Sequence, residues 1–190
     1  MKFLPFLFSP VIGIIALLSK GKVKAFYFGL ILFGLWLGLT IAIPAGSNAD
    51  ISRIASHYND FLSSSPSLIE VINTRSKPDY FSPLTMYLFG TILRLPVYIY
   101  FGFLGLLFSI FSVILFRKYS ELFQIKTFQE ILLFLFALLL IPVWYGINNV
   151  RFSLAVIIIC IAIFNSFKRM TLNCYFLLFL SLFIHYAVIS

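Results

Sequence analysis

The chain has 190 residues, of which 62% are hydrophobic and only 11% are charged. An ordinary soluble domain is about 45–50% apolar and about 25% charged, so the composition excludes a soluble enzyme, a disordered regulator and a secreted disulfide scaffold. The net charge of +8 matches the excess of Lys and Arg that membrane proteins carry in cytoplasmic loops, and we expect no nucleic-acid partner. The composition predicts an all-α, polytopic membrane protein.

Apolar runs predict about six transmembrane helices in a single domain over 1–190. A helix needs about 20 predominantly apolar residues to cross the hydrocarbon core. The expected spans lie near 3–19, 25–45, 95–116, 128–146, 149–167 and 171–190. Segment 80–93 is too short to cross and ends at Arg94, so we expect it to form a re-entrant or interfacial helix.

Three basic clusters predict the orientation of the spans. They are Lys20, Lys22 and Lys24; Arg117, Lys118 and Lys126; and Lys168 and Arg169. With six spans, and with 80–93 not crossing, all three clusters fall on one side, which the positive-inside rule makes cytoplasmic. The outer side then holds the loop 46–94 and the turn at 146–150.

Two glycines in the second expected span predict close helix packing. Gly34 and Gly38 form a GxxxG motif, which lets two helix backbones approach closely. We expect the partner helix to belong to the same chain; a dimer contact is the alternative.

The outer loop is predicted to begin with an amphipathic helix from about Asp50 to Leu62. Asp50, Arg53, His57 and Asp60 share one polar stripe at helical spacing. Apolar side chains cover the rest of that helix: Ile51, Ile54, Ala55, Tyr58, Phe61 and Leu62. Such a helix lies at a membrane surface, with the stripe facing either water, with internal ion pairs, or a polar cavity.

Further along the loop, two prolines bracket Asp79 and Tyr80 where the chain is expected to return toward the membrane. Pro78 and Pro83 at such an entry need no function. A carboxylate at the edge of a low-dielectric region, however, suits general-base chemistry.

Two ionisable residues lie at or within later spans. Arg151 opens the fifth expected span and either extends to the interface or holds an anion, because its guanidinium binds phosphate oxygens in bidentate fashion. His185 lies in the sixth expected span, where it either bonds a neighbouring helix or takes part in a site.

The remaining motifs give no sign of a metal or cofactor. Cys160 and Cys174 lie in apolar surroundings without ligand spacing, and the chain has two His, so we expect no metal site. A phosphate-binding glycine loop and a nucleophile elbow are both missing from the sequence.

The order of these features resembles the EpsG-type and Wzy-type polymerases of bacterial exopolysaccharide, capsule and O-antigen repeat units. The matching outer loop reads Asp50, Arg53, Tyr58 and Phe61, then Glu70, then Pro78-Asp79-Tyr80. The segment from Val150 to Ala155 is close to the family's R-x-x-x-A helix start, and His185, followed by a small residue and Ser190, is like its H-x-(S/A) helix. The chain departs from the family at Gly46–Asp50, where members often show a Gly-Arg-Asp-like stretch.

The resemblance implies glycosyl transfer at the outer face of the bacterial inner membrane, without a cofactor. A glycan would move from its undecaprenyl-pyrophosphate carrier to a hydroxyl of the next lipid-linked repeat unit. The substrate would be a lipid-linked oligosaccharide in the membrane, and a flippase and a chain-length regulator would be partners. The implied base is Asp50 or Asp79, with His185 and His57 behind them as further catalytic candidates. The implied pyrophosphate and sugar contacts are Arg151, Arg53, Arg75, Tyr58, Tyr80 and Trp144, with Arg94 and Tyr145 as helpers.

Two other classes stay open at this point. A lipid-linked glycan flippase or other membrane transporter would place charges near the bilayer midplane, whereas here they gather outside it. An inactive membrane remnant is the other alternative, because the sequence from Leu182 to Ser190 is still apolar. Family members are longer, so we expect these 190 residues to be an incomplete N-terminal part.

Overall fold

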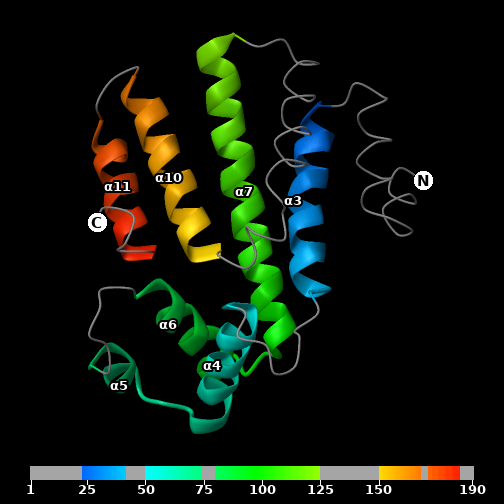
Figure 1. Ribbon diagram of the computed structural model, residues 1–190, viewed down its shortest axis with the longest axis vertical. Helices are drawn as coiled ribbons and strands as arrows, with labels where there is room; N and C mark the ends of the chain where they lie inside the picture. Colours follow the sequence, from blue (N-terminus) through cyan, green and yellow to red (C-terminus); the bar gives the residue numbers. More distant parts are fainter. Residues whose placement is uncertain (1–22, 42–49, 74–79, 125–149, 168–170, 185–190) are drawn as a thin grey trace, which may run out of the picture.

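The computed structural model describes residues 23–41, 50–73, 80–124, 150–167 and 171–184. Within these residues the protein is built from helices and their connections (Figure 1). The helices are α3 (Val23–Leu39), α4 (Asp50–Ser64), α5 (Leu68–Asn73), α6 (Phe81–Met86), the π-helix η1 (Tyr87–Ile92), α7 (Val97–Phe123), α10 (Val150–Ser166) and α11 (Leu172–Ile184). The all-α prediction is therefore confirmed for the part of the chain that the structure describes.

The apolar runs form the long helices of a bundle. Helix α7 is 27 residues long and is apolar enough to cross a membrane by itself. Helices α3, α10 and α11 are apolar but shorter in their described parts. They correspond to the expected spans near 25–45, 149–167 and 171–190, whereas the expected spans 3–19 and 128–146 lie outside the described residues.

Glycines join α3 to α7 in close contact. A Cβ atom added at Gly34 would collide with Ser109 and with the carbonyl oxygen of Gly105, and one at Gly38 would collide with the backbone of Phe101. Gly105 in turn lies against the backbone of Gly34. The predicted packing of the GxxxG motif within the chain is confirmed, because only hydrogen at these Cα atoms leaves room for the facing backbone.

The described residues of the basic clusters lie at one end of the bundle. Phe26 and Leu30 of α3 pack against Val113 and Phe116 of α7, so Lys24 lies at the same end of the bundle as Arg117. Lys118 follows at that end, where its ammonium group is 3.9 Å from a carboxylate oxygen of Glu121. The part of the basic pattern that the structure describes is thus gathered at one end.

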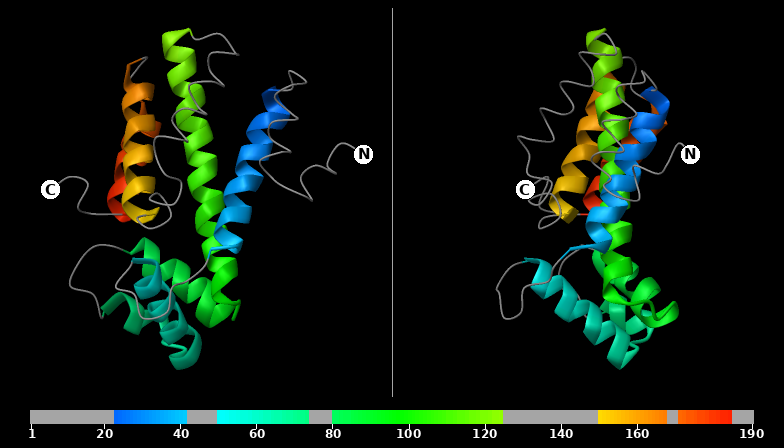
Figure 2. Two further views of the ribbon diagram at one scale, coloured as in Figure 1. Left: turned by 45° about the vertical axis from the view of Figure 1, so that its right-hand side comes forward. Right: turned by 90° about the vertical axis from the view of Figure 1, so that its right-hand side faces the viewer.

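The opposite end of the bundle is covered by the short helices α4, α5, α6 and η1 (Figures 1 and 2). Helix α5 begins with a capping box, in which the backbone N–H of Ser67 donates to Glu70 Oε2 at 2.7 Å and the backbone N–H of Glu70 donates to Ser67 Oγ at 3.3 Å. These bonds lower the pKa of Glu70.

Segment 80–93 is helical but short. Helices α6 and η1 have six residues each, which gives a length of about 18 Å at about 1.5 Å per residue, well below the about 30 Å of a hydrocarbon core. The expectation of a short helix that does not cross on its own agrees with this length. The segment packs on α4 and reaches α11.

Helices α10 and α11 form the other side of the bundle. Leu154, Ala155 and Ile158 of α10 are buried against Ile184 of α11, with Phe81 of α6 packed against the same cluster. Tyr119 of α7 meets Phe164 of α10 near the basic end, with ring centroids 6.0 Å apart. Helix α7 is therefore the central element, since it contacts both α3 and α10.

Candidate functional site

The covered end of the bundle brings together three segments that the sequence analysis singled out. Helix α10 begins there, α11 ends there, and α6 lies against both through Phe81. Helices α7 and α10 run in the same direction (Figure 1). Counting back from the contact of Tyr119 with Phe164, the start of α10 is level with Gly105, so α7 extends about 12 Å beyond it. The first turn of α10 is thus recessed from the tip of the molecule.

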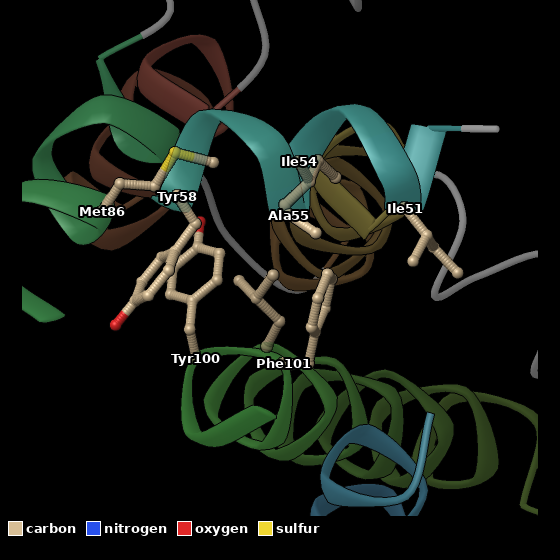
Figure 3. Close-up of a cluster of buried hydrophobic side chains, with 8 residues drawn as sticks. Ile51, Ile54, Ala55, Tyr58, Met86, Tyr100 and Phe101 are labelled. Atoms are coloured by element: carbon tan, nitrogen blue, oxygen red, sulfur yellow. The ribbon is translucent and has the colours of Figure 1, made fainter. Parts of the chain in front are cut away.

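Helix α4 packs on the first turns of α7 at this end (Figure 3). Its apolar face is buried, through Ile51, Ile54, Ala55 and Tyr58. This face meets a set of side chains from α6 and α7, namely Met86, Tyr100, Phe101 and Leu104. The burial confirms the apolar face predicted for the outer-loop helix.

Tyr58 is the most specific contact of α4. Its side chain is fully buried, its ring stacks on Tyr100 with centroids 5.0 Å apart, and its hydroxyl donates to the carbonyl oxygen of Leu95 at 2.7 Å. Burial, with the neighbouring Tyr100, raises the pKa of Tyr58 to about 12. The prediction that Tyr58 stacks on a sugar is therefore wrong, because a side chain without exposed surface has no face to offer a ligand.

One hydrogen bond and one close contact attach the end of α4 to η1. Thr91 Oγ1 donates to the carbonyl oxygen of Phe61 at 3.1 Å. Gly90 lies beside the same turn, because a Cβ at this position would be 3.3 Å from Phe61 Cβ. Helix α4 is therefore held at its middle by Tyr58 and at its carboxyl end by η1.

The polar face of α4 points away from the bundle. Arg53, His57 and Asp60 are exposed, and His57 Nδ1 lies 3.9 Å from Asp60 Oδ2. The predicted polar stripe is confirmed for Arg53, His57 and Asp60, which form an exposed face with a contact between His57 and Asp60. Arg53 stays a candidate for binding a charged ligand at this surface.

Tyr80 connects the entry of α6 to the end of α11. It is half-buried at the N-cap of α6, and its ring stacks on Phe183 with centroids 6.1 Å apart. One face of the Tyr80 ring is therefore occupied by protein.

Several predicted site residues lie outside the described residues, namely Asp79, Arg75, Trp144 and His185. Their sequence neighbours are nevertheless informative: Asp79 directly precedes Tyr80, and His185 directly follows Ile184. Asp50 is the first residue of α4, and Arg151 is the second residue of α10. The structure brings the starts of α6 and α10 and the end of α11 together, and it sets the polar face of α4 apart from them on the outside.

The sequence analysis missed the residues that receive α4. Tyr100 lies 1% exposed between Tyr58 and Phe89, and its hydroxyl is 3.2 Å from Thr85 Oγ1. Its helical spacing with Val97, Phe101 and Leu104 could have indicated a face of α7 that packs on protein, but not which segment packs there.

The first turn of α10 places the amino end of a helix at the covered end. The amino end of a helix carries unsatisfied N–H groups and a partial positive charge, so it favours an anion. Among the described residues, grouped His, Cys, Asp and Glu side chains that could hold a metal ion were not found. No family model, curated protein or solved structure matches this chain.

Proposed function

We propose that the chain is part of a multi-pass protein of the bacterial inner membrane that polymerises lipid-linked glycan repeat units at the outer face. The proposal combines the resemblance carried by the motifs with the arrangement of the helices. It makes the protein a membrane glycosyltransferase that needs no cofactor.

The architecture supports the membrane part of the proposal. Helix α7 is long enough to cross by itself, and α3, α10 and α11 pack beside it as apolar helices. Large apolar side chains of α10 and α11 are exposed, including Ile163, Phe176 and Phe179. Six spans follow if 3–19 and 128–146 also cross. Lys24, Arg117 and Lys118 then mark the cytoplasmic end.

One observation carries the catalytic part of the proposal: the start of α10, the end of α11 and the entry to α6 meet at one end of the bundle. These are the segments next to Arg151, His185 and Asp79 in the sequence. The described segments that meet at this end are distant from one another in the sequence, and each contains or directly adjoins one of these candidates in the sequence.

The chemistry of the transfer fits the groups that we assign to the covered end of the bundle. The acceptor hydroxyl oxygen forms a bond to the anomeric carbon, the bond from that carbon to the pyrophosphate oxygen of the carrier breaks, and undecaprenyl pyrophosphate leaves with the electron pair. A base accepts the hydroxyl proton, and we assign this role to Asp79 or His185, with Asp50 as the candidate on α4. The amino end of α10 and the guanidinium of Arg151 would stabilise the negative charge that develops on the leaving group.

The test is complementation of a deletion strain of the source bacterium. We expect Arg151→Ala to collapse the ladder of surface glycan to a single repeat unit, because removal of one transition-state stabiliser lowers a rate by roughly 10²–10³-fold. Arg151→Lys should restore part of the ladder, since an ammonium group keeps the charge but not the bidentate geometry. Gel analysis of the glycan and immunoblotting of membranes give the two readouts.

Arg117→Ala is the matched control, because it removes the same side chain at the opposite end of the bundle, beside Lys118. It should leave the ladder unchanged. A full ladder from Arg151→Ala at the wild-type protein level would remove Arg151 from the mechanism. Loss of every outer-face intermediate in the deletion strain would instead indicate a flippase.

A further inference from the structure

The junction between η1 and α7 presents an apolar surface that the described part of the protein does not cover. Leu88, Ile92 and Leu93 of this junction are 43%, 57% and 50% exposed, and Tyr98 in the first turn of α7 is 50% exposed. Hydrogen bonds in a π-helix join residues five apart, so Leu88 lies on the same face of η1 as Ile92 and Leu93. The opposite side carries Gly90, which packs against α4.

Arg94 follows this surface directly and is held outward by the backbone. It has a φ of 48° and an exposed side chain. The turn around it is closed by two bonds, from the N–H of Leu93 to the carbonyl of Leu88 and from the N–H of Leu95 to the carbonyl of Phe89, both at 2.9 Å. Glycine is the usual residue in this left-handed conformation. The backbone conformation therefore does not explain why this residue is an arginine.

The separation of Arg94, just before α7, from Arg117 near its end matches the thickness of a bilayer. Residues 95–116 are free of charge, and Arg117 is the next charged residue. The helical part of this run, from Val97 to Phe116, is about 30 Å long, which equals the hydrocarbon core of a typical bilayer. With Arg117 at one headgroup level, Arg94 falls at the other.

We propose that this junction, formed by Leu88, Ile92, Leu93, Arg94 and Tyr98, is a binding surface for an anionic phospholipid of the outer leaflet. The guanidinium of Arg94 binds the lipid phosphate, the aliphatic side chains enter the boundary of the acyl chains, and Tyr98 lies in the interfacial belt where tyrosine is enriched. The surface anchors η1, and through Thr91 and Tyr58 it fixes the height of α4 relative to the membrane. This inference rests on the membrane-spanning part of the proposed function and not on its chemistry.

Depth measurements with nitroxide labels test the proposal on the full chain in vesicles of phosphatidylglycerol mixed with phosphatidylcholine. Cys160 and Cys174 are first replaced by Ala, and single cysteines are then introduced at Ile92, at Phe179 and at Asn59. Phe179 is the reference for the hydrocarbon, because it is 65% exposed on α11, and Asn59, exposed on the polar face of α4, is the reference for water. Accessibility to oxygen and to a water-soluble nickel chelate should place the label at Ile92 between the two references.

Charge reversal tests the role of the arginine. Arg94→Glu should move the label at Ile92 toward the aqueous value in phosphatidylglycerol vesicles and have a smaller effect in phosphatidylcholine alone. Asn59→Glu adds a negative charge on α4 and should leave the label unmoved.

Three outcomes would overturn the proposal. A label at Ile92 as accessible to nickel as the one at Asn59 would show that the surface lies in water. A label that neither reagent reaches would show that a protein or a second copy of the chain covers it. An aqueous label at Phe179 would remove the membrane-spanning premise as well, which distinguishes that failure from the other two.

Discussion

Tyr58 shows how one side chain can have two interpretations until its neighbours are known. In sequence it is an aromatic residue in a polar loop, a position typical of sugar-binding residues. In the structure its ring is enclosed by Tyr100 and its hydroxyl is bonded to the carbonyl of Leu95. Because a buried polar group needs a partner, this bond accounts for the presence of tyrosine where phenylalanine would fill the same space.

Removal of that hydroxyl should weaken the docking of α4. We expect Tyr58→Phe to lower the free energy of unfolding by about 1–2 kcal/mol, because it leaves the Leu95 carbonyl without this donor. Thermal unfolding of the purified protein in detergent measures the effect. Tyr175→Phe is the control, since Tyr175 is 58% exposed on α11, and equal stability of the two variants would contradict the prediction.

The raised pKa of Tyr58 predicts a dependence on alkaline pH. A tyrosine in the unfolded chain has a pKa of about 10, and the folded protein raises that of Tyr58 to about 12. The contribution to stability is therefore complete below pH 10 and is lost as the pH rises from 10 to 12. In an ultraviolet titration of phenolate, Tyr58→Phe should remove one late-titrating group from the wild-type curve; an unchanged titration curve would refute the assignment.

At the scale of elements, the periodicity of apolar residues predicted α4 well, but packing partners decided its role. The expected helix from Asp50 to Leu62 is observed as Asp50–Ser64, with the expected residues buried and exposed. Its position on α7 was not predictable, because residues 97–116 carry no charge on any side, and the apolar face with Tyr100, Phe101 and Leu104 does not indicate which segment packs there.

The close contact of α3 and α7 predicts a ranking of glycine substitutions. Gly38→Ala should lower the free energy of unfolding by about 1–3 kcal/mol, as overpacking does, since the added Cβ meets the backbone of Phe101 and Gly102, which cannot rotate away. Gly90→Ala should change it by less than about 1 kcal/mol. Its nearest neighbour is a side-chain atom of Phe61 at 3.3 Å.

Unfolding of both variants in the same detergent gives this comparison. The pair is matched in chemistry, because each adds one methyl group to a helical glycine. A Gly90→Ala variant less stable than Gly38→Ala would show that the contact of α3 with α7 is more adaptable than the structure indicates.

At the scale of the whole molecule, basic residues at one end of the bundle and short helices at the other predict a fixed orientation. A single cysteine at Gln124, the exposed residue that ends α7, should resist an impermeant maleimide added outside intact cells. A single cysteine at Asn59 on α4 should react. Both should react after permeabilisation, and the reverse pattern in intact cells would invert the proposed topology and move the covered end to the cytoplasm.

The sequence by itself determined the helical class, the apolar helices and the amphipathic character of α4. Composition and periodicity show which side chains of a segment face water and which face apolar surroundings. It also identified Gly34 and Gly38 as a packing motif, since only small residues permit close approach. The tertiary structure alone decided that Tyr58 belongs to the core and that α10 starts beside α6 and the end of α11. These facts depend on contacts such as the hydrogen bond from Tyr58 to Leu95 and the packing of Phe81 against the buried cluster of α10 and α11. Such contacts join residues distant in the chain, which no local pattern records.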